Sequence, residues 1–366
     1  MSPKKKKEDN SGVTPLDQIN SYLEQNKGDH YNFEKERNYT VSSGSLKLDI
    51  EMGGGIKPGI IRASGVTEGG KTSCALSFAR NFQKMDNSMV VYIKSEGRLS
   101  EEMIKRAGID TDANKWFVYK SNVYESVVDF MRQLVKENAS DTRYMFIVDS
   151  MDALVPRGDL EKGSDEAVKV AGGSLLSSHF LRSMALAFAE KGHICYMISQ
   201  IRSNIKINPY EKGDPKVTNA SGGNALLHYS DWILEFQPRF KSDLITTQAA
   251  GKGDLLGHWC KIVFRKSSNE KTGIEVKYPI KYGQTGAKSV WVDYEVVDML
   301  LMWNMATAKG AWVTIADELI EEVEEKTGEE FKKQHQGPDN LRKYFQENTK
   351  ISEYLYNKFL NVLKKA

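Results

Sequence analysis

The segment from residue 65 to residue 72 has the residue types and spacing that hold a phosphate chain. It reads Gly65, Val66, Thr67, Glu68, Gly69, Gly70, Lys71 and Thr72, and Ser73 follows. This is the pattern G-x-x-x-x-G-K-[ST], in which glycines turn backbone N–H groups inward, the lysine reaches the β- and γ-phosphates and the threonine binds Mg²⁺. An apolar run precedes it and a helical pattern follows it, as the motif requires. We therefore predict a site for ATP and Mg²⁺ here; the competing interpretation is a chance glycine-rich turn.

Three more polar residues follow apolar runs that are typical of strands. Asp149 ends the run at 144–149, where a carboxylate at the carboxyl end of a parallel strand is suited to Mg²⁺. Glu96 lies two residues after the run at 89–93 and is placed to accept the proton of an attacking water. The alternative for Glu96 is an ordinary surface carboxylate. Gln200 ends a further run, where its amide either senses a γ-phosphate or caps a turn.

From residue 41 onward, short apolar runs alternate with helical patterns. The runs typical of strands are at 60–64, 89–93, 144–149, 193–199 and 232–236. The helical patterns between them are at 72–85, 99–107, 123–137 and 172–191. This succession predicts an α/β fold in which helices cover both faces of a mainly parallel central sheet. Two later runs, at 261–264 and 274–280, predict an antiparallel edge.

The core predicted in this way spans 41–290 and has an appendage at each end. Residues 1–40 are expected to form a tail and an arm, since the helical pattern at 15–25 has too few apolar residues for a core of its own. Residues 291–366 are expected to form a small, mostly helical domain. Within it, an acidic run at 317–330 precedes a stretch with eight Lys and Arg against three acids. Such runs are commonly solvated helix faces; the alternative is that the basic stretch gathers duplex DNA.

The composition argues against a membrane-spanning, a secreted or a disulfide-rich protein. The chain has 366 residues, of which 40% are hydrophobic and 27% charged, without the long apolar run that a membrane span or a secretory signal requires. Three cysteines, Cys74, Cys195 and Cys260, have no paired spacing, which predicts neither a disulfide framework nor a CxxC metal site. A net charge of +2 is too small to indicate a polyanion partner. A cytoplasmic protein is expected.

Several motifs occur together in the order and approximate spacing of a known family. Besides the phosphate-binding motif they are SGSLKLD at 43–49, IVDS at 147–150, SQIR at 199–202, SGGNAL at 221–226 and GAW at 310–312. On these motifs the chain, over about 41 to 312, resembles the RecA family of homologous recombinases. Its divergence and sparse arms resemble phage-encoded members such as UvsX. The resemblance implies a RecA-like ATPase core in a bacterial cell or a phage-infected host.

The resemblance also implies roles for individual residues. Lys71, Thr72 and Asp149 match the residues that bind phosphate and metal, Glu96 matches the catalytic glutamate, and Gln200 matches the residue that couples the γ-phosphate to a DNA-binding loop. ATP then lies between neighbouring subunits of a filament, and residues 1–40 act as an oligomerisation arm whose helix packs against the adjacent subunit.

The neighbouring subunit is expected to contribute two lysines from the strand at 261–266. Lys266 keeps one of this catalytic pair, while Phe264 occupies the other position, so that Arg265 is a candidate substitute. Tyr282 matches an aromatic near the adenine across the interface. Ser100 and Met103 replace an acidic and an aromatic residue near the base, which leaves the base selectivity open.

Two polar segments, 156–170 and 202–221, lie where the family has DNA-binding loops. The candidate DNA-binding residues are Arg157, Lys162, Lys169, Arg202, Lys206, Tyr210, Lys212, Lys216, Gly222, Gly223 and Asn224. Cations neutralise phosphates and an aromatic inserts between bases, which suits single-stranded DNA. The first segment also carries four acids, so backbone N–H groups are expected to contribute more there. A plain flexible loop is the alternative.

The favoured function is a DNA-dependent ATPase that forms a helical filament on single-stranded DNA and exchanges strands with homologous double-stranded DNA. One alternative is a hexameric RecA-like helicase or translocase with the same core. Another is a paralogue that binds nucleotide as a switch without hydrolysis. The arm before residue 41 and the segment 221–226 favour the filament, and Glu96 with Lys266 argues against the inactive paralogue.

Overall fold

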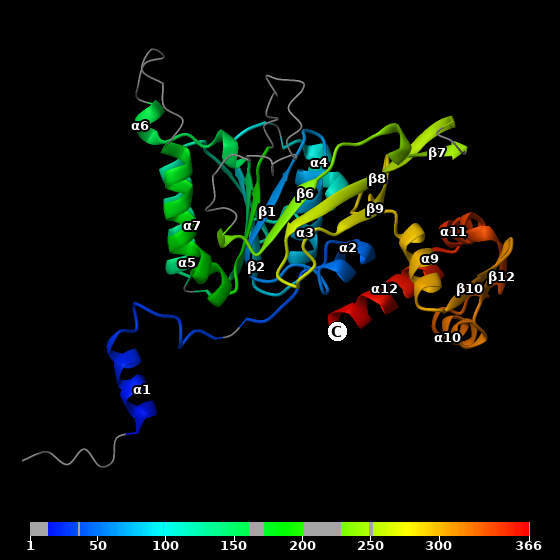
Figure 1. The fold of residues 1–366 in the computed structure, drawn as a ribbon, viewed down its shortest axis with the longest axis horizontal. Helices are drawn as coiled ribbons and strands as arrows, with labels where there is room; N and C mark the ends of the chain where they lie inside the picture. Colours follow the sequence, from blue (N-terminus) through cyan, green and yellow to red (C-terminus); the bar gives the residue numbers. More distant parts are fainter. Residues whose placement is uncertain are drawn as a thin grey trace, which may run out of the picture.

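The fold is built on one large twisted sheet. A computed structural model describes residues 14–35, 37–97, 99–138, 140–160, 172–200, 228–248 and 252–365. Within these residues a nine-stranded sheet has the order β3-β2-β4-β5-β1-β6-β8-β7, and β9 pairs with β8 (Figure 1). The first six strands of this order are mutually parallel, as the alternation of strand and helix predicts.

The parallel strands place their carboxyl ends along one edge. Their bounds are β1 (Gly59–Gly65), β2 (Ser88–Lys94), β3 (Trp116–Lys120), β4 (Arg143–Asp149), β5 (Ile194–Ile198) and β6 (Trp232–Phe236). In β1 every residue is buried, because helices cover the sheet on both faces. The phosphate-binding segment, Asp149, Glu96 and Gln200 all follow strands that are neighbours in this sheet.

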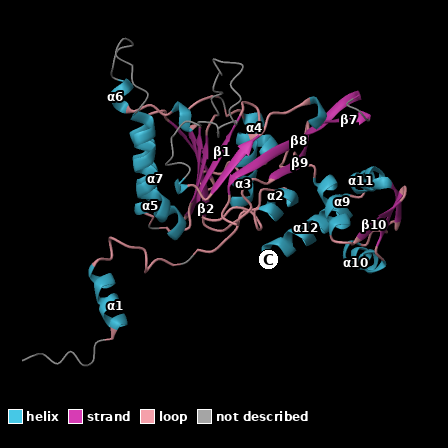
Figure 2. Cartoon of the chain, in the orientation of Figure 1, coloured by secondary structure: helices cyan, strands magenta, loops and turns pink. Residues whose placement is uncertain are grey.

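Helices cover the two faces of the sheet (Figure 2), and a separate hydrophobic cluster lies on each face. On one face pack α2 (Leu46–Glu51), α3 (Lys71–Phe82) and α4 (Glu101–Ala107). On the other face pack α5 (Tyr124–Lys136) and α7 (Gly172–Glu190). The predicted helices at 72–85, 99–107, 123–137 and 172–191 are confirmed to within three residues at each end.

The edge beyond β6 is antiparallel, as predicted, but it is larger than expected. β8 (Lys252–Lys266) pairs with β6, with β7 (Leu244–Gln248) and with β9 (Glu275–Lys281), all antiparallel. β3 and β7 were not predicted. β3 is nevertheless a short run of aromatic and β-branched residues, the composition that favours strands.

Residues after β9 form a third hydrophobic cluster. Its helices are α9 (Val292–Met302), α10 (Asp317–Thr327), α11 (Gly337–Glu347) and α12 (Thr349–Lys365). A small antiparallel sheet, which was not predicted, adds β10 (Ala306–Lys309), β11 (Trp312–Ile315) and β12 (Gln334–Gln336). Leu46 of α2 is buried in the same cluster and joins it to the domain built on the large sheet.

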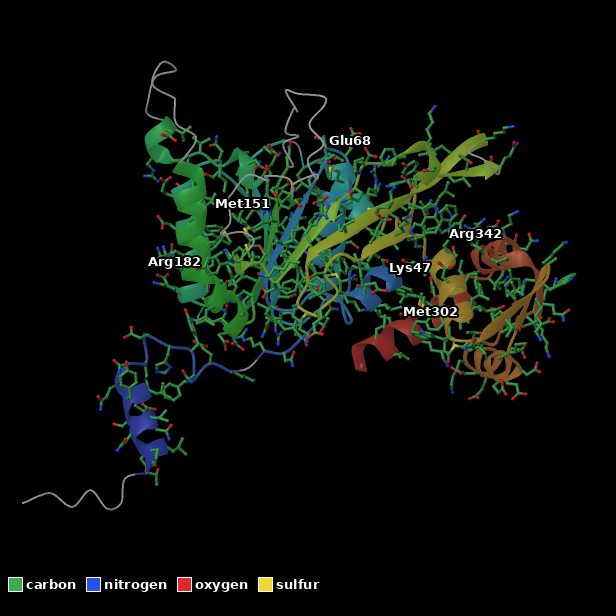
Figure 3. All side chains as sticks on the ribbon, in the orientation of Figure 1. Lys47, Glu68, Met151, Arg182, Met302 and Arg342 are labelled. Carbon is green, nitrogen blue, oxygen red and sulfur yellow. The ribbon has the colours of Figure 1, made fainter. Side chains whose placement is uncertain are left out.

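The acidic and basic runs of this region pair with each other. Lys333 contacts Asp317 at 2.6 Å, Lys350 contacts Glu329 at 2.6 Å, and Lys358 contacts Glu322 at 2.5 Å. Arg342 is buried: its guanidinium carbon lies 5.2 Å from the ring centre of Trp291 and 4.5 Å from that of Tyr294 (Figure 3). Arg342 therefore does not belong to an exposed basic surface.

The helix α1 (Pro15–Gln25) stands apart from the rest of the molecule (Figure 1). Thr14 caps it and exchanges hydrogen bonds with Asp17 in a capping box. No residue of α1 is buried, and Leu16 and Ile19 are 64% and 55% exposed. In the described part of the chain, no helix is long and apolar enough to cross a membrane.

Candidate nucleotide-binding site

The phosphate-binding loop joins the end of β1 to the start of α3. Gly65 has φ of +142°, and a Cβ at this position would lie 2.4 Å from the carbonyl oxygen of Phe236. Gly70 has φ of +103° and precedes the first residue of α3. Only glycine adopts these conformations readily and leaves room for the backbone to surround an anion. The loop therefore has the geometry that its sequence motif predicts.

Lys71 projects its amine into this loop. Nζ donates hydrogen bonds to the carbonyl oxygens of Gly65 at 2.9 Å and Val66 at 2.7 Å. The side chain is buried, and burial lowers its pKa, while the carboxylates of Asp149, Asp152 and Glu96 oppose that shift. A cation in this position is suited to a phosphate oxygen.

Thr72 and Asp149 meet at the start of α3. Thr72 Oγ1 donates to Asp149 Oδ2 at 2.9 Å, and the Tyr92 hydroxyl donates to the same oxygen. Burial raises the pKa of Tyr92, and the Asp149 carboxylate adds to the shift, so the hydroxyl stays a donor. A hydroxyl and a carboxylate together beside a phosphate loop are the ligand types that Mg²⁺ takes. The two residues predicted to bind the metal therefore fit it.

Glu96 lies beside Asp149 and is held by its neighbours. The N–H groups of Ser95 and Glu96 donate to the carbonyl oxygen of Asp149 at 3.1 and 3.3 Å. Ser150 Oγ donates to Glu96 Oε1 at 2.6 Å, and Gln200 Nε2 donates to the same oxygen at 3.3 Å. A cavity of about 360 Å³ is lined by Glu96, Asp149, Gln200, Thr72 and Tyr92. Glu96 and Gln200 therefore meet in one site, although they lie more than 100 positions apart in the sequence.

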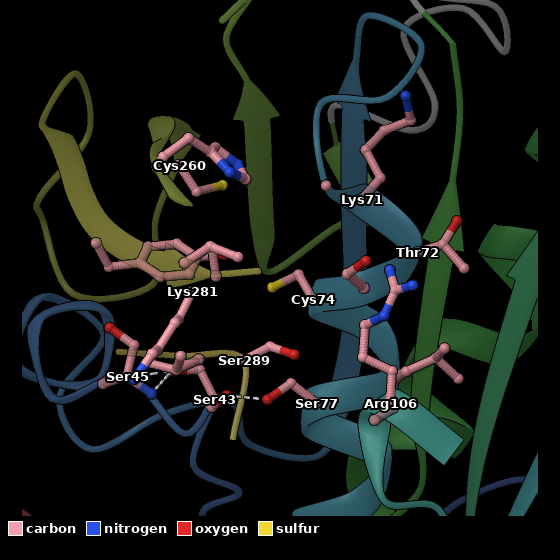
Figure 4. A pocket seen from close by; sticks show the side chains of 18 of the residues that line it. Ser43, Ser45, Lys71, Thr72, Cys74, Ser77, Arg106, Cys260, Lys281 and Ser289 are labelled. Atoms are coloured by element: carbon pink, nitrogen blue, oxygen red, sulfur yellow. Dashed lines mark hydrogen bonds between the residues drawn. The ribbon is translucent and has the colours of Figure 1, made fainter. Parts of the chain in front are cut away.

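A larger cavity of about 670 Å³ opens on the other side of the loop, between α3, α4 and the strands β8 and β9 (Figure 4). Residues 68–73 of the loop, including Ser73, form one wall, and Arg106 faces the cavity from α4. Met103 also lines it, whereas the Ser100 hydroxyl caps α4 by accepting from the Met103 N–H at 3.1 Å. This cavity is the candidate site for the base and ribose.

Tyr282 lines this cavity on its own chain, and its position near an adenine across a subunit interface stays a prediction. Arg239 donates to the Tyr282 hydroxyl at 2.9 Å and to the carbonyl oxygen of Glu68 at 3.3 Å. This bridge ties the aromatic ring to the phosphate loop.

His258 also lines the cavity, and no sequence pattern pointed to it. It is 7% exposed, its ring centre lies 5.3 Å from that of Tyr282, and its Nδ1 is buried without a hydrogen bond from the described residues. Burial lowers its pKa to about 4, and the Arg239 charge adds to the shift. A neutral imidazole therefore faces the cavity at ordinary pH.

The strand that was expected to supply cations to a neighbouring subunit uses several of its side chains for contacts within its own chain. Phe264 is fully buried, with its ring centre 5.2 Å from that of Trp232. Arg265 makes a two-pronged ion pair with Glu235, at 2.7 and 2.8 Å. Lys266 Nζ donates to the His228 carbonyl oxygen at 2.8 Å. Arg265 would have to break its ion pair with Glu235 before it could replace the missing lysine in a neighbouring subunit.

Most of the candidate DNA-binding residues lie outside the described residues. These are Lys162, Lys169, Arg202, Lys206, Tyr210, Lys212, Lys216, Gly222, Gly223 and Asn224. Arg157, at the start of the short helix α6 (Arg157–Leu160), is described and exposed. It contacts α5: its N–H donates to Glu125 at 2.9 Å and its guanidinium donates to Ser126 at 3.0 Å.

Comparison with known proteins identifies the family. The RecA N-terminal domain family matches residues 23–285. Protein RecA of Rippkaea orientalis is 28% identical over 315 residues, which cover 86% of this chain and 80% of that protein. Protein RecA of Aquifex aeolicus is 28% identical over 327 residues, which cover 89% of this chain and 84% of that protein. Because the family match spans well over half of the sequence, this chain belongs to the RecA family.

Proposed function

We propose that this chain binds ATP with Mg²⁺ at the phosphate loop, assembles as a helical filament on single-stranded DNA and pairs that strand with homologous double-stranded DNA. As a member of the RecA family it is an ATP-dependent recombinase and a DNA-dependent ATPase. One observation carries the proposal: Glu96 accepts hydrogen bonds from both Ser150 and Gln200 at the same sheet edge as Lys71, Thr72 and Asp149.

In this proposal each residue of the site has one task. Lys71 binds the β- and γ-phosphate oxygens, and Thr72 and Asp149 hold Mg²⁺, which when bound neutralises charge on the phosphates. Glu96 orients a water molecule and accepts its proton as the water attacks the γ-phosphorus. Gln200 reports the state of the γ-phosphate to the segment that follows it. Tyr282 and Met103 contact the base.

The DNA-binding part of the proposal rests on the two segments 156–170 and 202–221. Their lysines and arginines neutralise phosphates, and Tyr210 stacks on bases. Lys332 and Lys343 are exposed in the C-terminal region and are the candidates for gathering duplex DNA there, with buried Arg342 excluded. Lys266 is the candidate cation for a neighbouring subunit.

The proposed setting is the cytoplasm of a bacterial cell or of a phage-infected host. Identity of about 28% to bacterial relatives agrees with a divergent branch, and a phage origin remains a prediction.

ATP hydrolysis measured with and without single-stranded DNA tests this proposal. We expect the rate to rise when single-stranded DNA is added, and strand exchange to require ATP. The matched control is Lys71→Ala, which removes the phosphate cation and is expected to lose both activities. Hydrolysis that does not respond to DNA, together with no strand exchange, would contradict the proposal.

A further inference from the structure

Arg62 is a buried cation on the central strand β1, beneath the nucleotide site, and it has no role in the proposed function above. The residue is 3% exposed, and its Nε donates to Ser199 Oγ at 3.1 Å. Burial lowers the pKa of its guanidinium, and the charge of Asp152 opposes that shift. A buried guanidinium persists only where an opposite charge and hydrogen bonds replace water. Asp152 provides that charge from the short 3-10 turn Met151–Ala153 that follows β4.

Asp152 has a second contact, on the other side. Its Oδ2 accepts the backbone N–H of Gln200 at 2.5 Å, which is a short, charge-assisted hydrogen bond. Its Oδ1 is buried and has no hydrogen bond to the described residues. The Asp152 carboxylate therefore holds the backbone of Gln200 by this hydrogen bond, and its negative charge acts on the Arg62 guanidinium.

The Gln200 side chain, in contrast, is held weakly. Its Nε2 lies 3.3 Å from Glu96 Oε1, at the long end of the hydrogen-bond range, whereas Ser150 Oγ lies 2.6 Å from the same oxygen. A small displacement of the Gln200 backbone is therefore enough to make or break the contact with Glu96. Whatever fixes that backbone controls the contact.

We propose that Asp152 is a positioning residue that sets the distance between Gln200 and Glu96 and thereby couples DNA binding to ATP hydrolysis. Asp152 makes its hydrogen bond to the Gln200 backbone, and we infer that it acts through Gln200; its charge on Lys71 is lost equally in Asp152→Ala and Asp152→Asn, so a difference between these two variants reports the Gln200 contact. This role of Asp152 rests on the proposed function, because it assumes that single-stranded DNA raises the rate of ATP hydrolysis.

Two substitutions at one position test this role. Asp152→Asn keeps an oxygen that accepts the Gln200 N–H, and Asp152→Ala removes it. We expect Asp152→Ala to lower the DNA-stimulated kcat by at least about tenfold, within the usual range of coupling between two sites. The KM for ATP should stay within about twofold, because Asp152 does not bind substrate. Asp152→Asn should restore most of the stimulation. As a control, Ser199→Ala removes a partner of Arg62, leaves the Gln200 contact in place and should keep the stimulation.

Asp152→Ala and Asp152→Asn both remove a negative charge that acts on the buried Arg62 guanidinium, so the folding of each must be checked by thermal unfolding. If either variant does not fold, the pair Arg62→Met/Asp152→Ala and Arg62→Met/Asp152→Asn makes the same comparison without a buried charge. The inference is overturned if the Ala variant keeps wild-type stimulation, or if Asn and Ala lose it equally. A wild-type protein whose ATPase ignores single-stranded DNA would contradict the proposed function instead.

Discussion

Thr72 and Asp149 are joined by a hydrogen bond of 2.9 Å, although 77 positions separate them in the chain. The bond links the first turn of the helix after the phosphate loop to the end of β4. It places a hydroxyl and a carboxylate where one Mg²⁺ can contact both.

Replacing Thr72 with Val should weaken ATP binding in the presence of Mg²⁺ by at least about tenfold, because the loss of a bond to a charged partner is worth about 1.5–3 kcal/mol. Thr72→Ser keeps the hydroxyl and should bind within about threefold of wild type on the same scale. Titration calorimetry with ATP, with and without Mg²⁺, measures both. Equal affinity of the Val and Ser variants would contradict the role of the hydroxyl.

Glu96→Gln should lower kcat by about 100-fold or more, the usual contribution of a general base. The amide cannot accept the proton, but it can still accept the hydrogen bond from Ser150, so ATP binding should be kept. Single-turnover hydrolysis separates the two effects. Glu101→Gln, an exposed carboxylate in the first turn of α4, is the control and should hydrolyse ATP normally. Wild-type turnover by Glu96→Gln would remove the general base from the mechanism.

Tyr282→Ala should weaken nucleotide binding about fivefold, since an aromatic contact contributes about 1 kcal/mol beyond its buried area. Tyr282→Phe keeps the ring and should bind almost normally, although it loses the hydrogen bond from Arg239. Fluorescent ATP analogues provide the measurement. Trp312→Ala, half-exposed in the small C-terminal sheet, is the control and should leave the affinity unchanged. An unchanged affinity in Tyr282→Ala would place the base elsewhere.

Glu295 should make stability depend on pH. It is fully buried in α9, where it accepts the Leu46 N–H at 2.8 Å and a hydrogen bond from Ser45. Burial raises the pKa of its carboxyl to about 7, although both hydrogen bonds oppose the shift. The folded protein therefore binds this proton more tightly than the unfolded chain does. The stability from this group is complete below about pH 4.5 and is lost as pH rises through about 7.

Urea unfolding at about pH 5 and about pH 8.5 checks this prediction. The free energy of unfolding should fall by an amount on the order of 3 kcal/mol through Glu295. Glu295→Gln cannot ionise and should lose that part of the pH dependence, whereas Glu318→Gln, exposed on α10, should keep it. The same pH dependence in wild type and Glu295→Gln would contradict the assignment.

The parts of the site that could be predicted from sequence are those with a local signal. The loop before Lys71 has a motif, and Asp149, Glu96 and Gln200 each follow an apolar run, so parallel strands had to bring them to one edge. The contact of Asp152 with the Gln200 backbone had no such signal, because it depends on which strands are neighbours. His258 likewise becomes part of the site only when β8 crosses beside the phosphate loop.

Packing explains the remaining differences. The sequence shows that Phe264 occupies a position where a lysine was expected. Its burial against Trp232, however, depends on the pairing of β6 with β8. Arg342 lies in a basic stretch, yet two aromatic rings from another part of the chain enclose it. The strands β10 and β12 are only four and three residues long and mostly exposed, so hydrophobic alternation cannot reveal them.

ATP bound at this site is expected to drive assembly on single-stranded DNA. Electron microscopy of the protein with single-stranded DNA and a slowly hydrolysed ATP analogue shows whether it does. We predict long helical filaments that require both DNA and nucleotide, and that Lys71→Ala does not form. Closed hexameric rings under the same conditions would instead indicate a helicase or translocase.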